Sequence, residues 1–463
     1  GVTGSGKTTT LMKMLTDIVK IEKTIIDKPT VERPYPVSRN VKASVLGLDW
    51  MKNMRNLASL PGLADSGRFR FYSILKPELG AFKWNPLAVP VKGMTTAEWR
   101  DSLADNFTAA FSLGEFGRSL IYEYLTDLYN ANRLEPFVLM EEKIDKNQQV
   151  IRRKITLPPI PEEQIPSNSI FVGSDGVRYA NAFTYPELSR CISIADLATY
   201  VAGKIEFGST TDGARLTGTQ MRDRLQSLWR RIQYFAPGNQ YNDLLPSDPD
   251  LVTKISLNVN DLIDPDKGLI TILETDGLDQ GARRLILGSV LLAIYKNGLF
   301  NGDGHFDHNG SGPGCFVIME ESHELFGDSS KSEDTFSAET RTNLYEGMFR
   351  RVRALGLRLI PVAQQPSALP EAVTANVNTV FIHKIRAKDD RDKAFSLLNW
   401  SNAIGQQLRE YRYLGELPTG YCIARLDAKD DYTESAPIQF KTEMPILENV
   451  TDRFLASIKL KSN

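Results

Sequence analysis

The chain has 463 residues, of which 41% are hydrophobic and 24% charged, and its formal net charge is −2 at pH 7. This composition is that of a globular protein with a large core, and it excludes a low-complexity chain. The near-neutral charge also excludes nucleic-acid binding by the whole surface, so any such contact has to come from a local patch.

Cysteine usage and hydropathy exclude two further classes. The three cysteines, Cys191, Cys315 and Cys422, are widely spaced and form no C-x-x-C pair, which argues against a disulfide framework or a zinc cluster. The longest apolar run, around 285–295, is too short and too interrupted to cross a bilayer, so we predict no transmembrane segment. We therefore expect the protein in a reducing cytoplasm.

The chain opens with a phosphate-binding motif. Residues 1–8 read GVTGSGKT, which matches G-x-x-x-x-G-K-[ST], and a helix-compatible run follows directly. In this motif backbone N–H groups turn around the β-phosphate, the lysine meets the β and γ oxygens, and the last hydroxyl binds Mg²⁺. We predict ATP and Mg²⁺ as ligands, with Thr8 on the metal and with nucleotide contacts from Gly4, Ser5, Gly6, Lys7, Thr8 and Thr9.

A phosphate-binding loop is normally fed by a buried strand, and no residue precedes Gly1 here. We therefore expect the sequence to be a fragment whose upstream domain is missing. Any targeting signal would be missing with it, so its absence does not bear on location.

Two short apolar runs follow, at 43–48 and 70–74, and both are bounded by turn-forming residues as buried strands are. The segment 82–87 predicts a rigid turn. Thr95 and Glu98 form a capping box, and helical periodicity then runs to about 134 with a break near 114–117. We expect two helices there.

From about 138 to 211 the sequence is charged, proline-rich and weakly periodic, which predicts an insertion, and a helix-rich stretch at about 218–235 closes it. Strands and helices then alternate, which implies a mostly parallel sheet with helices on both faces. The predicted strands lie at 269–273, 315–319, 358–362, 380–384 and 421–425, and the predicted helices at 280–296 and 339–354. The predicted fold is α/β, with a P-loop core at 1–90 and 255–430, a helix-rich insertion at 91–254 and a C-terminal tail at 431–463.

The apolar strand at 315–319 ends in two adjacent carboxylates, Glu320 and Glu321. A P-loop ATPase needs such a strand because its carboxyl end delivers acid to the metal and to the attacking water. We assign Glu320 to the Mg²⁺ shell and Glu321 to orienting or deprotonating water. Alone, the pattern also fits a buried strand that ends in surface acids, and its combination with the P-loop favours the catalytic role.

The strand at 358–362 ends in the polar segment AQQPS at 363–367. Gln364 is a candidate for contacting the γ-phosphate or its water. By itself, a glutamine here would simply close a strand–loop junction. Its position after the acidic strand favours the catalytic role.

Taken in order, these motifs resemble the HerA branch of the HerA–FtsK superfamily, whose members are hexameric DNA-pumping ATPases. The matches cover about 1–87 and 257–426, and they comprise the GxxxxGKT loop, an N-P-L turn, the E-E-x-H segment, a basic helix, the Q-x-P-S segment and N-x-N-T at 376–379. Two positions depart from the family pattern: Ser322 stands where alanine is usual, and Gln365 where arginine is usual.

The resemblance implies a RecA-like core that hydrolyses ATP between subunits of a hexameric homo-oligomer. It implies sequence-independent movement of double-stranded DNA, with a partner nuclease or other effector in end processing or phage defence. It also implies that Arg350 or Arg353 contacts phosphate as a sensor, with Lys331 a weaker candidate, and that an arginine finger comes from just before the P-loop. Without the resemblance, Arg350 and Arg353 read as a solvated helix face.

Two other functions stay open. A conjugation or type IV secretion ATPase shares the P-loop, the N-P-L turn and the acidic strand. A nucleotide-gated scaffold would bind ATP to assemble an effector enzyme and would hydrolyse it slowly or not at all, although the paired Glu320 and Glu321 argue against a dead site. Channel loops are expected in the insertion or near 328–335.

The histidines carry weaker signals. His323 reads as a packing or hydrogen-bonding residue rather than a link to a channel loop. The glycine-rich stretch 301–314 contains His305 and His308 but lacks a set of ligands with metal-binding spacing, so we predict no structural metal.

Overall fold

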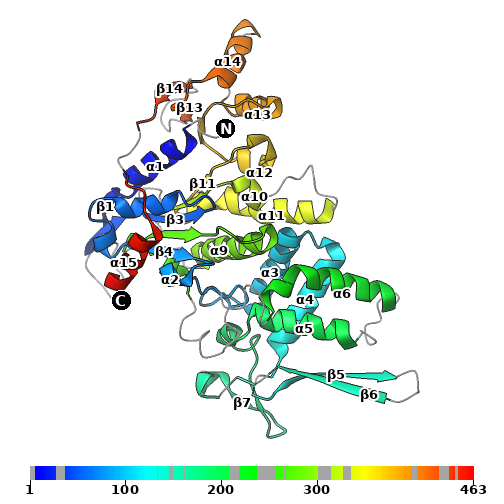
Figure 1. Ribbon diagram of the computed structural model, residues 1–463. Helices are drawn as coiled ribbons and strands as arrows, with labels where there is room; N and C mark the ends of the chain where they lie inside the picture. The colour runs from blue at the N-terminus through cyan, green and yellow to red at the C-terminus, as the bar shows by residue number, and fades with distance from the viewer. Residues whose placement is uncertain are drawn as a thin grey trace.

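We describe the protein from a computed structural model. Its elements stack along one direction, with a small antiparallel sheet at one end, a parallel sheet in the middle, a layer of helices beyond it and two hairpins at the far end (Figure 1). The structure describes residues 6–27, 37–132, 134–144, 150–157, 159–160, 162–165, 167–207, 218–236, 257–264, 267–300, 314–326, 335–398, 404–426, 437–443 and 447–462.

Ten longer helices account for most of the helical residues described. They are α1 (Lys7–Ile18), α3 (Thr96–Phe111), α4 (Gly114–Asn130), α5 (Ile194–Phe207), α6 (Gly218–Ile232), α9 (Gln280–Phe300), α11 (Thr335–Arg351), α13 (Lys388–Leu398), α14 (Ile404–Glu416) and α15 (Asp452–Ser462). Short helical turns include α2 (Pro77–Gly80), α8 (Val259–Leu262), α10 (Ser322–Phe326), α12 (Glu371–Thr374), η1 (Met54–Ser59) and η9 (Pro366–Ala368). Among the helices described, none has the length and apolar character needed to cross a membrane.

The centre of the molecule is a five-stranded sheet in the order β11-β10-β3-β9-β4, with every pairing parallel. Its strands are β3 (Ser44–Asp49), β4 (Phe69–Ser73), β9 (Ile270–Glu274), β10 (Cys315–Met319) and β11 (Leu357–Pro361). Every residue of β3 and β9 is buried, as expected of parallel strands that are covered on both faces. The predicted α/β fold with a mostly parallel sheet is confirmed.

Helices cover both faces of this sheet. Successive side chains of a strand point to opposite sides, so neighbouring residues of β3 pack in different clusters. Val45 packs in a cluster with Leu11 and Leu15 of α1, and Leu455 of α15 joins the same cluster. Leu46 instead packs in the larger cluster that contains α3, α9 and α11. A two-stranded antiparallel hairpin, β1 (Glu22–Asp27) with β2 (Val37–Lys42), links α1 to the sheet.

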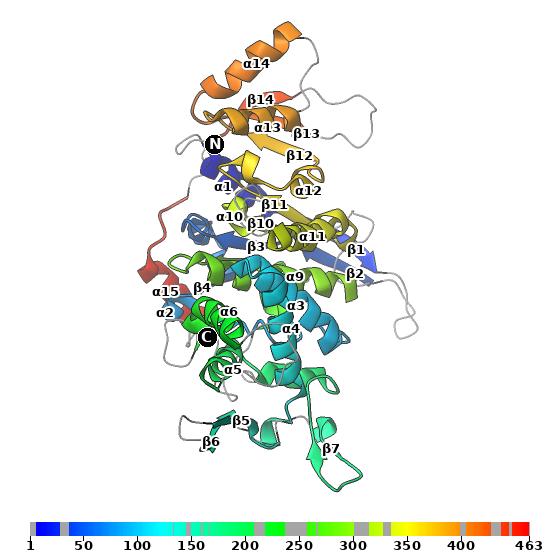
Figure 2. The same cartoon turned by 90° about the vertical axis from the view of Figure 1, so that its right-hand side faces the viewer.

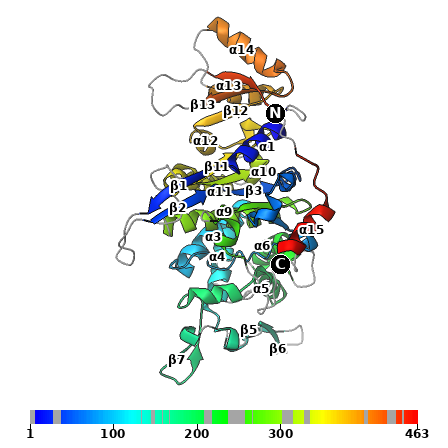
Figure 3. The same ribbon diagram turned by 90° about the vertical axis from the view of Figure 1, so that its left-hand side faces the viewer.

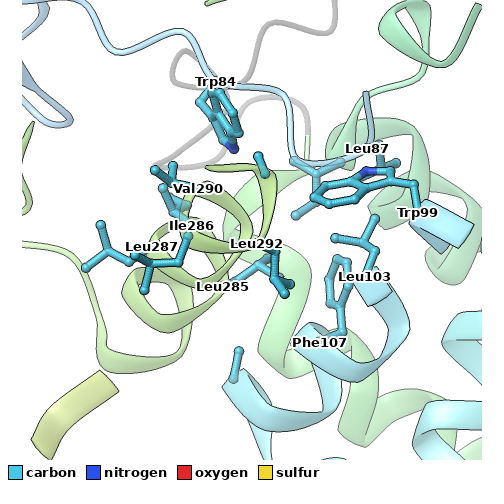
Figure 4. Close-up of a cluster of buried hydrophobic side chains, with 14 of the residues drawn as sticks. Trp84, Leu87, Trp99, Leu103, Phe107, Leu285, Ile286, Leu287, Val290 and Leu292 are labelled. Atoms are coloured by element: carbon cyan, nitrogen blue, oxygen red, sulfur yellow. The ribbon is translucent and has the colours of Figure 1, made fainter. Parts of the chain in front are cut away.

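The larger cluster is built around α9. Its side chains, among them Leu285, Val290 and Leu292, lie close to Trp99 and Phe107 of α3 (Figure 4). Each fully buried leucine or phenylalanine stabilises the fold by about 1.5–3 kcal/mol. Helix α3, which lies inside the predicted insertion, is thereby held to the core; its predicted capping box at Thr95 and Glu98 is confirmed.

The stretch predicted as weakly periodic contains regular structure that the sequence pattern did not indicate. A long hairpin, β5 (Phe137–Ile144) with β6 (Val150–Leu157), and a short one, β7 (Phe171–Val172) with β8 (Arg178–Tyr179), project at the far end. Charged residues in β5 and β6 hide the alternation typical of strands. Helix α5 was missed although its buried residues Ile194, Leu197, Ala198 and Val201 recur at helical spacing, because it was included in a stretch interpreted as weakly periodic throughout.

The strands predicted at 380–384 and 421–425 exist, but they do not extend the parallel sheet. They are β12 (Thr379–Ile382) and β13 (Tyr421–Leu426), which pair antiparallel and, with β14 (Ile438–Lys441), form a separate three-stranded sheet. This correction has a simple cause, since apolar runs do not reveal strand direction. The second sheet lies with α13 and α14 at one end of the molecule, and α1 lies between the two sheets (Figure 2).

The region predicted as a C-terminal tail includes β14 and α15. The helix folds back onto the side of the parallel sheet (Figure 3), where it packs against α2. The Asp452 carboxylate accepts hydrogen bonds from Arg55 Nη1 at 2.7 Å and from Lys76 Nζ at 2.6 Å. These ion pairs and the burial of Leu455 hold the end of the chain to the core.

Candidate active site

Polar side chains follow one another along the carboxyl edge of the parallel sheet. Asp49 at the end of β3 is in register with Glu274 at the end of β9. The N–H of Glu320 donates to Leu48, which places Glu320 beside Asp49, and Gln364 follows the neighbouring strand β11. Ligands of open α/β sheets bind outside this edge. This edge is therefore the candidate site.

The described part of the phosphate-binding motif, from Gly6 onward, leads into helix α1. Helix α1 begins at Lys7, and Gly6 before it has φ of 104°, a conformation that glycine adopts without strain. Burial lowers the pKa of the Lys7 ammonium, while the carboxylates of Glu321 and Glu320 oppose that shift. Lys7 therefore lies within the field of both predicted acids. Thr8 is exposed and Thr9 half-buried in the first turn, whereas Gly4 and Ser5 lie outside the described residues.

Glu321 is held in an uncommon backbone conformation. Its φ is +48°, in the left-handed region that few non-glycine residues occupy. The side-chain amide Nε2 of Gln364 donates to Glu321 Oε1, and His323 Nδ1 lies 3.4 Å from Glu321 Oε2. Backbone strain of this kind is common at functional sites, where the surrounding structure maintains it. The two residues predicted to handle water are thus brought into direct contact.

Glu320 faces inward rather than toward Gln364. Its side chain is 5% exposed, and Oε1 accepts a hydrogen bond of 2.8 Å from Asn53 Nδ2. Burial, and next the charge and hydrogen bond of Asp49, raise the pKa of Glu320 to about 8. Its Oε2 atom is buried without a hydrogen-bond partner among the described residues. A buried carboxylate oxygen that lacks a partner fits a hard cation such as Mg²⁺.

Asp49 is a site residue that the sequence reading missed. It is fully buried, and its carboxylate accepts backbone hydrogen bonds from Met51, Asn53 and Met54 at 2.8 to 3.2 Å. The turn that it closes also contains Lys52, whose φ is +59°. This turn directs Asn53 toward Glu320. An apolar strand that ends in an acid was the available signal, and it is the same signal that identified Glu320.

The antiparallel sheet also reaches the phosphate-binding motif. A Cβ placed on Gly6 would lie 3.0 Å from the Cα of Gly420 and 3.5 Å from Nδ1 of His383. The hydroxyls of Thr10 and Thr442 form a buried hydrogen bond of 2.7 Å. These residues flank the strands of the antiparallel sheet: His383 follows β12, Gly420 precedes β13 and Thr442 follows β14. Nothing in the sequence pattern predicts their position.

The remaining predicted residues are placed as follows. Arg350 is on an exposed face of α11, where it pairs with Glu346 one turn earlier. The backbone of Arg353 belongs to the turn after α11, but its side chain is outside the described part, as are Lys331, His305, His308 and the segment 328–334. Ser322 Oγ donates to the carbonyl of Val362 at 3.1 Å, so this departure from the family pattern adds a link between β10 and β11.

A hollow of about 480 Å³ opens beside Glu321. Its lining includes Trp50, Arg283, Gln364 and Gln365, and the Arg283 guanidinium lies 4.3 Å from the centre of the Trp50 ring. Gln365, the second departure from the family pattern, is exposed at its rim. Glu321 is thus part of the wall of this hollow, next to Gln364.

Comparison with known proteins gives a likeness in fold. The chain is similar to VirB4 of Thermoanaerobacter pseudethanolicus, with 13% identity, a TM-score of 0.49 and coverage of 87% of this chain and 82% of that chain. It is also similar to the bacterial conjugative coupling protein TrwB in an unbound form (9% identity, TM-score 0.44, 88% and 87% covered) and in complex with ADP and Mg²⁺ (12%, 0.42, 89% and 87%). No protein-family model and no curated protein matches the sequence. The activity therefore has to be inferred from the residues of the site.

Proposed function

We propose that this chain is a Mg²⁺-dependent ATPase. The observation that carries the proposal is the meeting of Lys7, Glu320 and Glu321 at the carboxyl edge of the sheet, with Gln364 donating to Glu321. A P-loop ATPase needs these elements: a cation for the phosphates, acids for the metal and the water, and an amide that reports on the γ-phosphate.

In the proposed reaction Lys7 and the helix N-terminus hold the β and γ phosphates of ATP. Glu321 orients a water molecule and accepts its proton as oxygen bonds to the γ phosphorus and the bond to the ADP oxygen breaks. Thr8 and Glu320 would hold Mg²⁺, which when bound neutralises charge on the β and γ oxygens. Gln364 fixes the position of the Glu321 carboxylate.

We further propose that the ATPase acts as a ring-shaped homo-oligomer, a hexamer, that moves along double-stranded DNA without reading its sequence. Support comes from the order of motifs that resembles the HerA branch. The Arg350 side chain is 66% exposed, so a sensor role for it requires phosphate presented by another subunit. A partner nuclease or effector, and a role in end processing or phage defence, rest on the resemblance alone.

Two alternatives make different predictions. A conjugation or secretion ATPase would share the site; VirB4 and the conjugative coupling protein TrwB, whose folds are similar, make this class the second candidate. A nucleotide-gated scaffold would bind ATP and assemble an effector while hydrolysing little. The rate of ATP hydrolysis and its response to DNA therefore distinguish the three proposed functions.

The first experiment measures ATP hydrolysis with and without linear duplex DNA at two salt concentrations, beside the Lys7→Ala variant. We expect several-fold stimulation by DNA that weakens at high salt, because phosphate contacts release counterions. Lys7→Ala should abolish both the basal and the stimulated rates. A hydrolysis rate that is the same with and without DNA would favour the conjugation or secretion class. Nucleotide binding without hydrolysis would favour the scaffold.

A further inference from the structure

The loop that carries Gln364 is fixed at both ends. At its start, the Val362 N–H donates to Met319 at 2.9 Å, and the Val362 carbonyl accepts from Ser322 N at 2.9 Å and Ser322 Oγ at 3.1 Å. At its end, Asp390 Oδ1 accepts from Ser367 N at 3.1 Å and from Ser367 Oγ at 2.7 Å. The first anchor belongs to the parallel sheet, and the second belongs to α13.

Only residues 363–366 lie between the two anchors. Gln364 is within this span and donates to Glu321, and Pro366 is buried at the start of η9. Helix α13 packs against η9. The position of the Gln364 amide therefore depends on where α13 holds Ser367.

Asp390 is suited to this role by its burial. It lies in the first turn of α13 and is 8% exposed, whereas its neighbour Asp389, in the same turn, is exposed. Both acids face the N-terminal end of the helix dipole and stabilise it in the same way. The contact with Ser367 distinguishes them.

We infer that Asp390 is a positioning residue for ATP hydrolysis, which holds Ser367 and thereby keeps the Gln364 amide on Glu321. The inference rests on the proposed ATPase function. It also gives the antiparallel sheet a role in that function, because α13 follows β12, and residues that flank the strands of this sheet lie beside Gly6 and bond to Thr10. The nucleotide motif and the Gln364 loop are thus held from the same side.

The first test compares Asp390→Ala with Asp389→Ala. Both remove an acid from the first turn of α13, but Asp390→Ala alone removes the acceptor for Ser367. A displacement of about 1 Å in a reacting group costs about 10²-fold, so we expect kcat to fall by about 10- to 100-fold in Asp390→Ala with KM nearly unchanged. Asp389→Ala should keep the wild-type kcat. Asp390→Asn, whose amide oxygen still accepts both hydrogen bonds, should restore most of the rate.

Ser367→Ala provides a milder variant, since it keeps the backbone N–H bond to Asp390 and removes only the hydroxyl. We expect an intermediate loss of kcat, and we expect the double variant Ser367→Ala/Asp390→Ala to be no slower than Asp390→Ala. Additive losses would show that the two residues act independently and would overturn the inference. A folded Asp390→Ala variant with wild-type kcat, or one whose loss is entirely in nucleotide affinity, would also overturn it.

A second measurement does not require hydrolysis. Amide hydrogen exchange should become faster in residues 357–369 of Asp390→Ala and stay at the wild-type rate in Asp389→Ala, with the α1 amides unchanged in both. Faster exchange confined to α13 would mean that Asp390 only stabilises its own helix. If the wild-type protein does not hydrolyse ATP, the proposed function fails, and the exchange result still decides whether Asp390 holds this loop.

Discussion

The two sheets of this protein differ in burial and in the residues that they contribute to the candidate site. In the parallel sheet every residue of β3 and β9 is buried, whereas every residue of β14 in the antiparallel sheet is at least partly exposed. The parallel sheet presents Asp49, Glu320 and Gln364 from the ends of its strands. Residues that flank the antiparallel sheet support the phosphate-binding side: His383 lies beside Gly6, and Thr442 bonds to Thr10 in the first turn of α1. The candidate reactive groups therefore follow strands of the central sheet, and the peripheral sheet supports the phosphate-binding motif.

The largest effect should come from the edge of the parallel sheet. Glu321→Gln removes the proposed proton acceptor, and we expect the hydrolysis rate to fall by about 10²- to 10⁴-fold, the usual contribution of a general base. ATP binding should persist because Lys7 is unchanged. Glu324→Gln, in the short helix α10 that follows Glu321, serves as the control and should have a small effect. A Glu321→Gln variant with wild-type turnover would refute the assignment.

The next effect concerns a buried ion pair at the same edge. Arg55 Nε and Nη2 donate to Glu274 at 2.9 and 2.7 Å, and the Glu274 side chain is only 2% exposed. Arg55→Ala would leave that carboxylate unpaired, and we expect the free energy of unfolding to fall by about 3–5 kcal/mol. Chemical denaturation measures the loss.

The matched control is a surface pair of the same charges. Lys52 and Asp276 are 40% and 50% exposed, so Lys52→Ala should change the free energy of unfolding by at most about 1 kcal/mol. Equal losses in the two variants would mean that burial at the parallel sheet does not set the strength of its ion pair.

Substitutions at the junction between the two sheets should reduce the free energy of unfolding by less. Thr10→Val or Thr442→Val breaks one buried hydrogen bond between hydroxyls, and we expect each to reduce the free energy of unfolding by about 0.5–1.5 kcal/mol. The double variant removes both polar partners and should cost less than the sum of the two. Strict additivity in denaturation experiments would show that the two hydroxyls are not coupled.

The smallest effect should come from the half-exposed contacts that fasten α15. Hydrogen bonds from Lys76 and then Arg55 hold the pKa of Asp452 below its usual value of 3.8. For a carboxylate with a lowered pKa, the stabilisation is present above 3.8 and is lost as the pH falls through the lower folded value. The difference in Tm between the wild type and Asp452→Asn should therefore be constant near neutral pH and shrink in acid. A difference that grows in acid would contradict this account.

The local elements and most candidate site residues could be predicted from the sequence alone. The phosphate-binding motif, the apolar strands ending in Glu320 and Gln364, and the capping box at Thr95 are local patterns, and apolar runs between turn residues are enough to place β3, β9 and β10. The α/β fold with a mostly parallel sheet was therefore predictable. Arg350 and Arg353 were proposed from a family resemblance, and their sensor role stays a prediction.

The contacts between residues far apart in the sequence are seen only in the folded structure. Asp49 is separated from Glu320 by hundreds of residues, and Thr10 from Thr442 by more, so neither contact leaves a periodic signal in the chain. The direction of β12 and β13 was undetermined for the same reason, because an apolar strand reads alike in parallel and antiparallel pairing. The contact of Ser367 with Asp390 likewise exists only because α13 packs against η9. Long-range packing, which single-sequence patterns do not encode, assembles the site from those local pieces.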